Sequence, residues 1–469
     1  MHCNYCKKAI GLFDDLYWDE KYVVLCFECF TKLHSKGIEK YKLGGRWVMP
    51  KWWTIPKFMN HVKLLKKILD RHNLEIAFKY ALHDRVYIDS YYDHFEIDYA
   101  SQNQDEIING LVEELKDLDN YILKPAYTYS LPKSDLNNRR MIYIPFKDLV
   151  LRYAFVIILA EQLDAGLSSK CFANRKAKDE RSNVSLLQDF AYESWPNFCR
   201  WQNEFAKKSS FLLRTDISSF YDSISHEYLT GLIADELSVG INTPLIILFR
   251  KLLEVPVISY THLYLMDNEE KNQKPQLMQQ SLPIGNNTEG FLANLFLKNI
   301  DEEMHSFKKV EFGRYNDDMR LFSNDRGAVL EAVKVLKELL LIKGLNLNTG
   351  KTVFAEKRDR VEQLRSKDYN KDDYDHQFKL DKKLENNKDA KYFCKILDSY
   401  KTPTDIEKLE EILIRWPGNS KHATWLIIHS AFYKGAYPDD NTQETIGKAK
   451  EVLFNSLKSE QINSYAKYR

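Results

Sequence analysis

The stretch at residues 310–323, VEFGRYNDDMRLFS, constrains the fold more than any other part of the chain. Apolar residues alternate on both sides of a polar Asn-Asp pair, and such pairs are common in tight turns between antiparallel strands. The pattern predicts a β-hairpin that carries Asp317 and Asp318 at its tip. Taken alone, such a tip is usually a plain solvated turn, so the rest of the sequence must decide whether it holds a metal.

A third aspartate, Asp216, ends the apolar stretch 209–218, SSFLLRTDIS, which has the pattern of a buried strand. Mg²⁺ prefers oxygen ligands and is usually held by one or two carboxylates together with substrate phosphates. Two such ions about 4 Å apart can activate a 3′-hydroxyl and stabilise a leaving pyrophosphate. Adjacent aspartates repel each other, and a bound cation would offset that repulsion. The three aspartates therefore predict a two-metal site for phosphoryl transfer.

The segments around these aspartates mix helices and strands without the regular period of a parallel doubly wound sheet. An antiparallel sheet backed by helices, an α+β layer, fits this order better. Ser225 is the expected N-cap of one helix and Gly344 the expected stop of another. The predicted helices lie at 60–82, 105–119, 225–237, 288–304 and 327–343, and strand character returns at 345–354.

Five consecutive blocks resemble those of the reverse transcriptases, and together they span residues 137–355. Each block is weakly specific by itself, but all five in this order are highly specific. The resemblance implies a right-hand polymerase with fingers and palm. The blocks are NNRRMIYIPFKDLVLRYAFVIILAEQL with CFANR (137–175), FLLRTDISSFYDSI (211–224), SLPIGNNTEGFLANLFL (281–297), YNDD (315–318) and GLNLNTGKT (344–352).

The resemblance also implies roles for single residues. Asp216 and Asp317 would bind two Mg²⁺ ions with help from Asp318, and the Ile217 carbonyl would complete one metal shell. Lys351 matches the lysine proposed to protonate pyrophosphate in this family, although a solvated lysine after a turn is an equally good reading of the sequence.

Tyr221 occupies the family's steric-gate position, where an aromatic ring under the sugar excludes a 2′-hydroxyl, so it favours dNTPs over NTPs. Gly285 would let the backbone approach the nucleotide or the template closely. Arg140 and Arg175 are candidates for the triphosphate, because guanidinium groups suit phosphate oxygens. Arg139 could take the place of Arg140, and a surface role for either arginine competes with this assignment.

The sequence departs from the common family pattern at Ile284, at Glu289 and at the Asn of YNDD. Ile-Gly after Leu-Pro, the CFANR block and the all-helical C-terminus look most like the bacterial reverse transcriptases of the abortive-infection and defence-associated type. That resemblance implies antiphage defence through DNA synthesis. In such proteins the synthesis uses a partner non-coding RNA, needs no template, or starts from a protein side chain.

Near the N-terminus, four cysteines have the spacing C-x2-C-x19-C-x2-C, which suits a tetrahedral structural Zn²⁺ site. The basic, Trp-rich segment behind them predicts contact with nucleic acid or a partner subunit. Trp52 and Trp53 could stack on bases, but ordinary core packing explains them more simply. The zinc ligands are Cys3, Cys6, Cys26 and Cys29.

These patterns predict four parts of the chain. Residues 1–45 form a zinc-binding module, residues 46–136 an N-terminal helical extension, residues 137–355 the fingers and palm, and residues 356–469 a helical thumb or C-terminal domain. The net charge is only +1, so nucleic acid would bind to a local basic face rather than to a globally basic chain.

Location follows from what the chain lacks. It opens without the charged and apolar regions of a secretory signal, and its longest apolar run, residues 153–160, is far too short to cross a membrane. Two close cysteine pairs indicate metal binding in a reducing compartment rather than a disulfide framework. We therefore expect a cytoplasmic protein with no membrane partner.

Three functional readings remain open. The first is a DNA polymerase that uses dNTPs and Mg²⁺, with RNA as template and DNA as product. The second is a polymerase-like scaffold whose zinc module recruits RNA or a partner, and the third is an RNA-synthesising polymerase, which Tyr221 argues against. The template, the primer and the oligomeric state, whether homo- or hetero-oligomer, are not given by the sequence.

Overall fold

The structure is a computed structural model that describes most of the chain between residues 60 and 356 and shorter pieces elsewhere. The predicted zinc ligands Cys3, Cys6, Cys26 and Cys29 lie outside the described residues, as do Trp52 and Trp53. The described ranges are 17–18, 24–25, 42–43, 46–47, 60–88, 93–118, 120–132, 138–178, 185–188, 193–259, 276–356, 384, 390, 393–394, 406–416, 423–424, 426–427 and 443–458.

The chain falls into two compact units. Unit 1 comprises residues 1–127, 143–258 and 268–366, and unit 2 comprises residues 128–142, 259–267 and 367–469. All three candidate aspartates belong to unit 1, so the geometry of the candidate site is a property of that unit alone.

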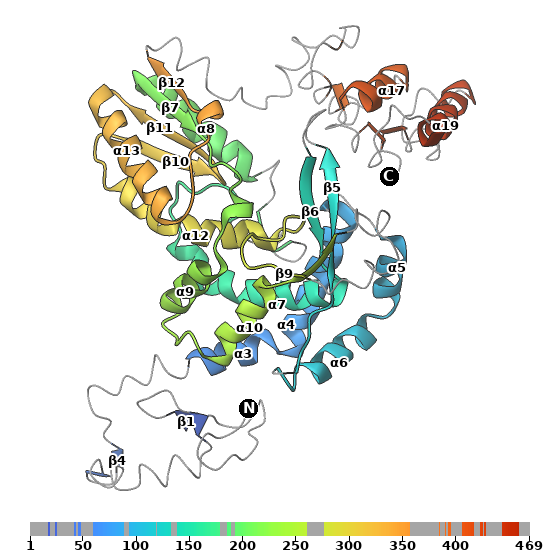
Figure 1. The fold of residues 1–469 in the computed structure, drawn as a ribbon, viewed down its shortest axis with the longest axis vertical. Coiled ribbons are helices and arrows are strands. Elements are labelled where there is room, and N and C mark those ends of the chain that lie inside the picture. Colours follow the sequence, from blue (N-terminus) through green and yellow to red (C-terminus); the bar gives the residue numbers. More distant parts are fainter. Residues whose placement is uncertain are drawn as a thin grey trace. The chain divides into compact units, whose positions relative to one another are not determined.

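Unit 1 contains a four-stranded antiparallel sheet with the order β10-β11-β7-β12 (Figure 1). Its central strand β7 pairs with β11 as far as Thr215 opposite Met319, and with β12 as far as Arg214 opposite Val353. The predicted hairpin and the antiparallel sheet backed by helices are both confirmed. The strands are β7 (Phe211–Thr215), β10 (Glu311–Tyr315), β11 (Asp318–Ser323) and β12 (Val353–Glu356).

Side chains alternate between the two faces along each strand, and a different set of helices covers each face. On one face Leu212 and Phe322 pack with Phe198 of α8 (Trp195–Lys208). The other face is covered by α12 (Thr288–His305) and α13 (Arg326–Ile342), and there Phe312 meets His305 edge to face. Both faces of the sheet are therefore covered by helices.

The helical part of unit 1 is centred on α7 (Phe146–Leu163), which is buried along nearly its whole length. Its Phe155 stacks on Phe249 of α10 (Pro244–Leu253) at 5.1 Å between ring centroids. The buried Arg152 is balanced by Glu289 of α12, 2.6 Å away, and the two side chains are 3% and 1% exposed. Glu289, where the sequence departs from the common pattern of the family it resembles, is therefore the counter-ion of a buried arginine.

The N-terminal helices of unit 1 differ from the sequence prediction in two places. The helix predicted at 60–82 is divided in two, because Asp70 caps a new helix by accepting a hydrogen bond from the His72 N–H at 3.0 Å. The helix predicted at 105–119 ends at Glu114. The helices are α3 (Asn60–Ile68), α4 (Arg71–His83), α5 (His94–Gln102) and α6 (Gln104–Glu114).

The later predictions hold with one exception. Ser225 caps α9 (His226–Glu236), and Gly344, with φ of 73°, follows the end of α13. The strand predicted at 345–354 forms only where β12 begins. The residues before β12 contain a 3₁₀ turn and bond to residues 216–218, just after β7, through one isolated bridge and two backbone hydrogen bonds. The short strands β8 (Pro256–Ser259) and β9 (Gln276–Leu277) pair antiparallel.

Unit 2 holds most of β5 (Ala126–Pro132) and β6 (Asn138–Tyr143), which are hydrogen-bonded neighbours. It also holds α17 (Ile406–Arg415) and α19 (Gln443–Lys458). A small hydrophobic core in this unit includes Phe393, Leu409 and Leu426.

Two short strand pairs lie in the first fifty residues, namely β1 (Tyr17–Trp18) with β2 (Val24–Leu25) and β3 (Lys42–Leu43) with β4 (Arg46–Trp47). Among the helices that the structure describes, none combines the length and apolarity needed to cross a membrane.

Gly313 tests the packing of the sheet against α8. A Cβ at position 313 would lie 2.6 Å from the Trp201 ring, whereas a Cβ at Gly231 of α9 would meet nothing within 4 Å. Gly313→Ala should lower the free energy of unfolding by about 1–3 kcal/mol, and Gly231→Ala should leave it unchanged or raise it by up to ~1 kcal/mol. Chemical denaturation measures both, and equal effects of the two substitutions would contradict this packing.

Candidate active site

The ends of three strands bring Asp216, Asp318 and Lys351 to one edge of the sheet. The pairing of Thr215 with Met319, continued by one residue, sets Asp216 opposite Asp318, and the pairing with β12 continued in the same way leads to Lys351. Residues directly opposite each other in such a ladder lie about 4.5–5.5 Å apart. A direct contact agrees with this register, because Lys351 Nζ donates to Asp216 Oδ2 at 2.7 Å.

Asp317 lies in the loop of the hairpin and is electrostatically coupled to the same group. Burial raises the pKa of Asp317 to about 6, with help from the negative charges of Asp216 and Asp318, while Lys351 acts in the opposite direction. The charge of Asp216, about one hundred residues earlier in the sequence, thus lies close enough to help raise the pKa of Asp317.

The backbone of Asp216 is fixed by the segment that precedes β12. Asn348 donates its backbone N–H to the Asp216 carbonyl at 2.7 Å, and its side-chain amide lies 3.5 Å from Asp216 Oδ1. The buried Ile217 forms a single bridge with Leu347, and the N–H of Ser218 donates to the Asn346 carbonyl at 2.9 Å. Residues 346–348 thus hold residues 216–218 in place through individual hydrogen bonds rather than through a continuous strand pairing.

Asp318 is held by an arginine that the sequence analysis did not single out. Arg320 donates to both of its carboxylate oxygens, at 2.6 and 2.9 Å, and also to Gln202 Oε1 of α8 at 2.9 Å. The Arg320 side chain is only 4% exposed. The signal was present in the sequence, because residues two apart on a strand share a face.

A second arginine supports the hairpin from inside. Arg314, fully buried, makes a two-pronged ion pair with Asp301 of α12 at 2.7 and 2.8 Å, and also donates to Asn294 Oδ1 at 2.7 Å. Burial works against the charge, yet Asp301 raises the pKa of Arg314 overall, so it stays cationic. The same guanidinium donates to the Asn316 carbonyl at 3.2 Å and so anchors the tip of the hairpin.

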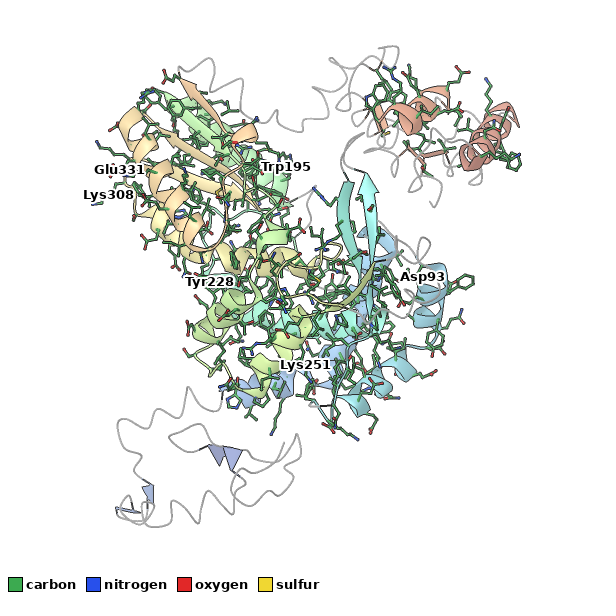
Figure 2. All side chains as sticks on the ribbon, in the orientation of Figure 1. Asp93, Trp195, Tyr228, Lys251, Lys308 and Glu331 are labelled. Carbon is green, nitrogen blue, oxygen red and sulfur yellow. The ribbon has the colours of Figure 1, made fainter. Side chains whose placement is uncertain are left out.

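Aromatic side chains fix the outer flank of the same hairpin. The hydroxyl groups of Tyr315 and Ser194 lie 3.0 Å apart, and the Trp195 ring meets the Tyr315 ring edge to face at 5.1 Å between centroids. Trp195, labelled in Figure 2, is the first residue of α8. The hairpin that carries Asp317 is therefore held on both flanks.

Tyr221 connects two of the sequence blocks. Its backbone carbonyl accepts the N–H of Leu282 at 2.9 Å, and its hydroxyl donates to Asn316 Oδ1 at 3.3 Å. Gly285, three residues after Leu282, has φ of 149°, a conformation that L-residues with side chains rarely adopt. The structure thus brings Tyr221 next to the hairpin tip.

The two predicted phosphate-binding arginines have different surroundings. Arg175 is engaged inside unit 1, where it pairs with Asp164 at 2.9 Å and donates to the carbonyl oxygens of Asp164 and Ser168. Arg140 lies on β6 in unit 2 with an exposed side chain, as does its neighbour Arg139. A phosphate role for Arg175 would require it to exchange some of these bonds.

Within the described part of the chain, no three His, Cys, Asp or Glu side chains are already arranged as a metal-holding group. Lys351 and Arg320 act as counter-ions for Asp216 and Asp318 in this structure. The carboxylates themselves are hard oxygen donors of the kind that Mg²⁺ prefers. The donor set therefore fits a divalent cation, which would compete with the two basic side chains.

An antiparallel sheet backed by helices, with carboxylates at a strand end and at a hairpin tip, agrees with the polymerase palm that the sequence resemblance implies. The chain belongs to the reverse transcriptase family, since the family model described as "Reverse transcriptase (RNA-dependent DNA polymerase)" matches residues 131–389, more than half of the 469 residues.

Solved structures give a weaker likeness. Apo telomerase from Candida tropicalis aligns at 10% identity with a TM-score of 0.40, covering 81% of this chain and 69% of that one. The same telomerase truncated from its C-terminal domain aligns at 12% identity with a TM-score of 0.35, covering 50% of this chain and 51% of that one. Likenesses at this level carry no functional argument. No curated protein matched the sequence.

The protonation of Asp317 tests whether the negative charges of Asp216, Asp317 and Asp318 are crowded together. Its pKa is about 6 in the folded protein and roughly 3.9 in an unfolded chain. The folded state therefore binds this proton more tightly, and that stabilisation is present below pH ~4 and lost as the pH rises through ~6. Asp317→Asn should raise the free energy of unfolding at pH 8, without divalent ions, by on the order of 1–3 kcal/mol and change it little at pH 4.

Thermal or chemical unfolding at the two pH values measures this difference. Asp98→Asn, at an exposed position of α5, is the control. It should change the free energy of unfolding by the same amount at pH 4 and at pH 8. If Asp317→Asn raises the free energy of unfolding equally at pH 4 and pH 8, repulsion between the carboxylates is not the cause of the increase.

Proposed function

We propose that this chain is a DNA polymerase that adds dNTPs to a 3′-hydroxyl by two-metal phosphoryl transfer. The observation that carries the proposal is the strand register, which continues from Thr215 and Met319 to set Asp216 opposite Asp318, next to Asp317 in the hairpin loop. Membership of the reverse transcriptase family supports the same chemistry.

The proposal assigns two Mg²⁺ ions to Asp216 and Asp317, with Asp318 assisting and the Ile217 carbonyl completing one shell. Bound there, the ions would activate the attacking 3′-hydroxyl and stabilise the leaving pyrophosphate. The raised pKa of Asp317 supports this assignment, because a divalent cation is the natural relief for a buried excess of negative charge.

Lys351 places its side-chain amine beside the carboxylates. Its side chain is 54% exposed and its Nζ lies 2.7 Å from Asp216 Oδ2. This placement lets it balance the charge of Asp216 in the absence of metal and hold a proton at Nζ for the pyrophosphate leaving group. Its partial exposure leaves it free to turn from the one role to the other.

The nucleotide would be held by residues around Tyr221. The proposal gives the Tyr221 ring the role of excluding a 2′-hydroxyl, and gives Gly285 the role of admitting the nucleotide or template close to the backbone. Arg140 and Arg175 remain the proposed ligands of the triphosphate, the latter after exchange of its bonds to Asp164.

The biological setting is proposed from the sequence resemblance. We propose an RNA template, with a non-coding RNA as one source of it, and a role in bacterial antiphage defence within the cytoplasm. Cys3, Cys6, Cys26 and Cys29 would bind a structural Zn²⁺ that helps to recruit nucleic acid or a partner subunit.

The central experiment is nucleotide incorporation by the Asp317→Ala, Asp318→Ala double variant. It should lose more than about 99% of dNTP incorporation while keeping its circular dichroism spectrum. Asp235→Ala, an exposed position on α9, is the matched control and should remain active. DNA synthesis by the double variant at the wild-type rate would refute the assignment.

The substrates supplied in that assay separate the alternatives. Incorporation of dNTPs only with an RNA template supports reverse transcription, and incorporation without any template supports template-independent or protein-primed synthesis. Incorporation of NTPs would indicate RNA synthesis. RNA binding without incorporation of either would indicate a scaffold.

The zinc assignment has its own test. Metal analysis of the purified protein should find about one zinc ion per chain, which the Cys26→Ala variant should lose. Cys394→Ala, which alters a buried cysteine of unit 2, should keep it. A wild-type protein without zinc, or equal loss from both variants, would exclude the four-cysteine site.

A further inference from the structure

Asn316, at the tip of the β10–β11 hairpin, contacts Tyr221. It is the residue before Asp317, and its Oδ1 accepts a hydrogen bond from the Tyr221 hydroxyl at 3.3 Å. The two residues are 95 positions apart. The contact therefore joins the block proposed to bind the metal ions to the block proposed to select the sugar. At 3.3 Å the bond is longer than the usual O–H···O distance, which sets an upper limit on its strength.

The backbone of Asn316 is held in place independently of this bond. Its φ of 58° lies in the left-handed region, which Asn adopts more readily than most residues. Its carbonyl accepts from the buried Arg314, whose position is set by the two-pronged ion pair with Asp301. The Asn316 amide therefore projects from a fixed point rather than from a mobile loop.

The Tyr221 ring is held from other directions as well. The buried Phe220 meets it edge to face at 5.4 Å between centroids, and the Tyr221 carbonyl is bonded to the Leu282 N–H. The bond to Asn316 acts at the far end of the ring, where a small rotation produces the largest displacement.

We propose that Asn316 is a positioning residue that holds the Tyr221 ring in place and thereby sets the discrimination between dNTPs and NTPs. This rests on the proposed function, in which Tyr221 excludes the 2′-hydroxyl. A ring excludes a single extra oxygen only if it cannot yield by a few tenths of an ångström, because contact energies change steeply over that distance. Fixing the hydroxyl end of the ring removes that freedom.

A double-mutant cycle on the ratio of kcat/KM for dNTP to that for NTP tests the proposal. Tyr221→Phe removes only the hydroxyl, and Asn316→Gly removes the amide while allowing the left-handed backbone. Each should lower the ratio roughly two- to fivefold, in keeping with one long neutral hydrogen bond, and the double variant should lower it no further. Effects of the two substitutions that multiply would overturn the proposal.

Two further variants separate position from general damage. Asn316→Asp keeps an acceptor oxygen and tolerates the same backbone, so it should retain the wild-type ratio even if kcat falls. Tyr228 of α9 accepts a hydrogen bond from Lys343 at 2.6 Å through its hydroxyl. Tyr228→Phe removes that hydroxyl and should leave the ratio of dNTP to NTP use unchanged. A ratio for Asn316→Asp as low as that for Asn316→Gly would show that the hydrogen bond is not the cause.

A readout without catalysis keeps this inference distinct from the proposed function. With 3-fluorotyrosine placed at position 221, the ¹⁹F resonance should be single in the wild type and shifted or exchange-broadened in Asn316→Gly. An unchanged resonance would overturn the role of Asn316. If the wild type incorporates no nucleotide, the proposed function fails, and the resonance still decides whether Asn316 positions the ring.

Discussion

The register between β7 and β11 is the constraint on which the candidate site depends. Thr215 lies opposite Met319, so Asp216 follows β7 at the point where the hairpin turns. A slip of one residue would exchange the two faces of the strand and would set Phe322 among the residues that face α12 and α13. The aromatic layer of α8 on one face therefore fixes the position of the carboxylates at the end of the sheet.

Gathering carboxylates at one edge requires compensation elsewhere in the fold. An exposed lysine, Lys351, accompanies Asp216, and a buried arginine, Arg320, accompanies Asp318. Asp317 responds instead with a raised pKa. An exposed lysine can give way to a metal ion more easily than a buried arginine. This difference agrees with the proposed assignment of the cations chiefly to Asp216 and Asp317 rather than to Asp318.

Behind this edge, the pair of Arg314 and Asp301 makes the hairpin rigid. Removing one partner of a buried ion pair typically costs about 3–5 kcal/mol, because the other charge is left without compensation. The pair lies on the face that packs against α12, opposite to the face of Arg320. The tip that carries Asn316 and Asp317 is thus supported through its backbone and not only through its side chains.

Much of this arrangement was predictable from local sequence. Alternation gave the hairpin, an apolar run gave β7, and Ser225 and Gly344 marked helix ends through rules that act over a few residues. The break at Asp70 carried the same kind of signal and was missed. Strand alternation would also have paired Asp318 with Arg320.

Other features had no local signal. The bonds of Arg314 to Asp301 and of Tyr221 to Asn316 join segments that meet only once the fold has formed. For the same reason the segment around Asn348 was expected to be a strand, although it serves Asp216 through isolated bonds. The four cysteines proposed to bind zinc lie outside the described residues, and their spacing is the basis of that proposal.

The most direct measurement of the central claim is cleavage of the chain by Fe²⁺ bound in place of Mg²⁺, with hydrogen peroxide and ascorbate added. The bound Fe²⁺ reduces peroxide to hydroxide and a hydroxyl radical next to its own binding site, and ascorbate reduces the resulting Fe³⁺ again. If Asp216 and Asp317 together bind the two cations, mass spectrometry should find two clusters of cuts, one around Asp216 and one around Asp317, and excess Mg²⁺ should suppress both together. Cuts near only one of the two segments, or cuts that Mg²⁺ does not suppress, would contradict the account.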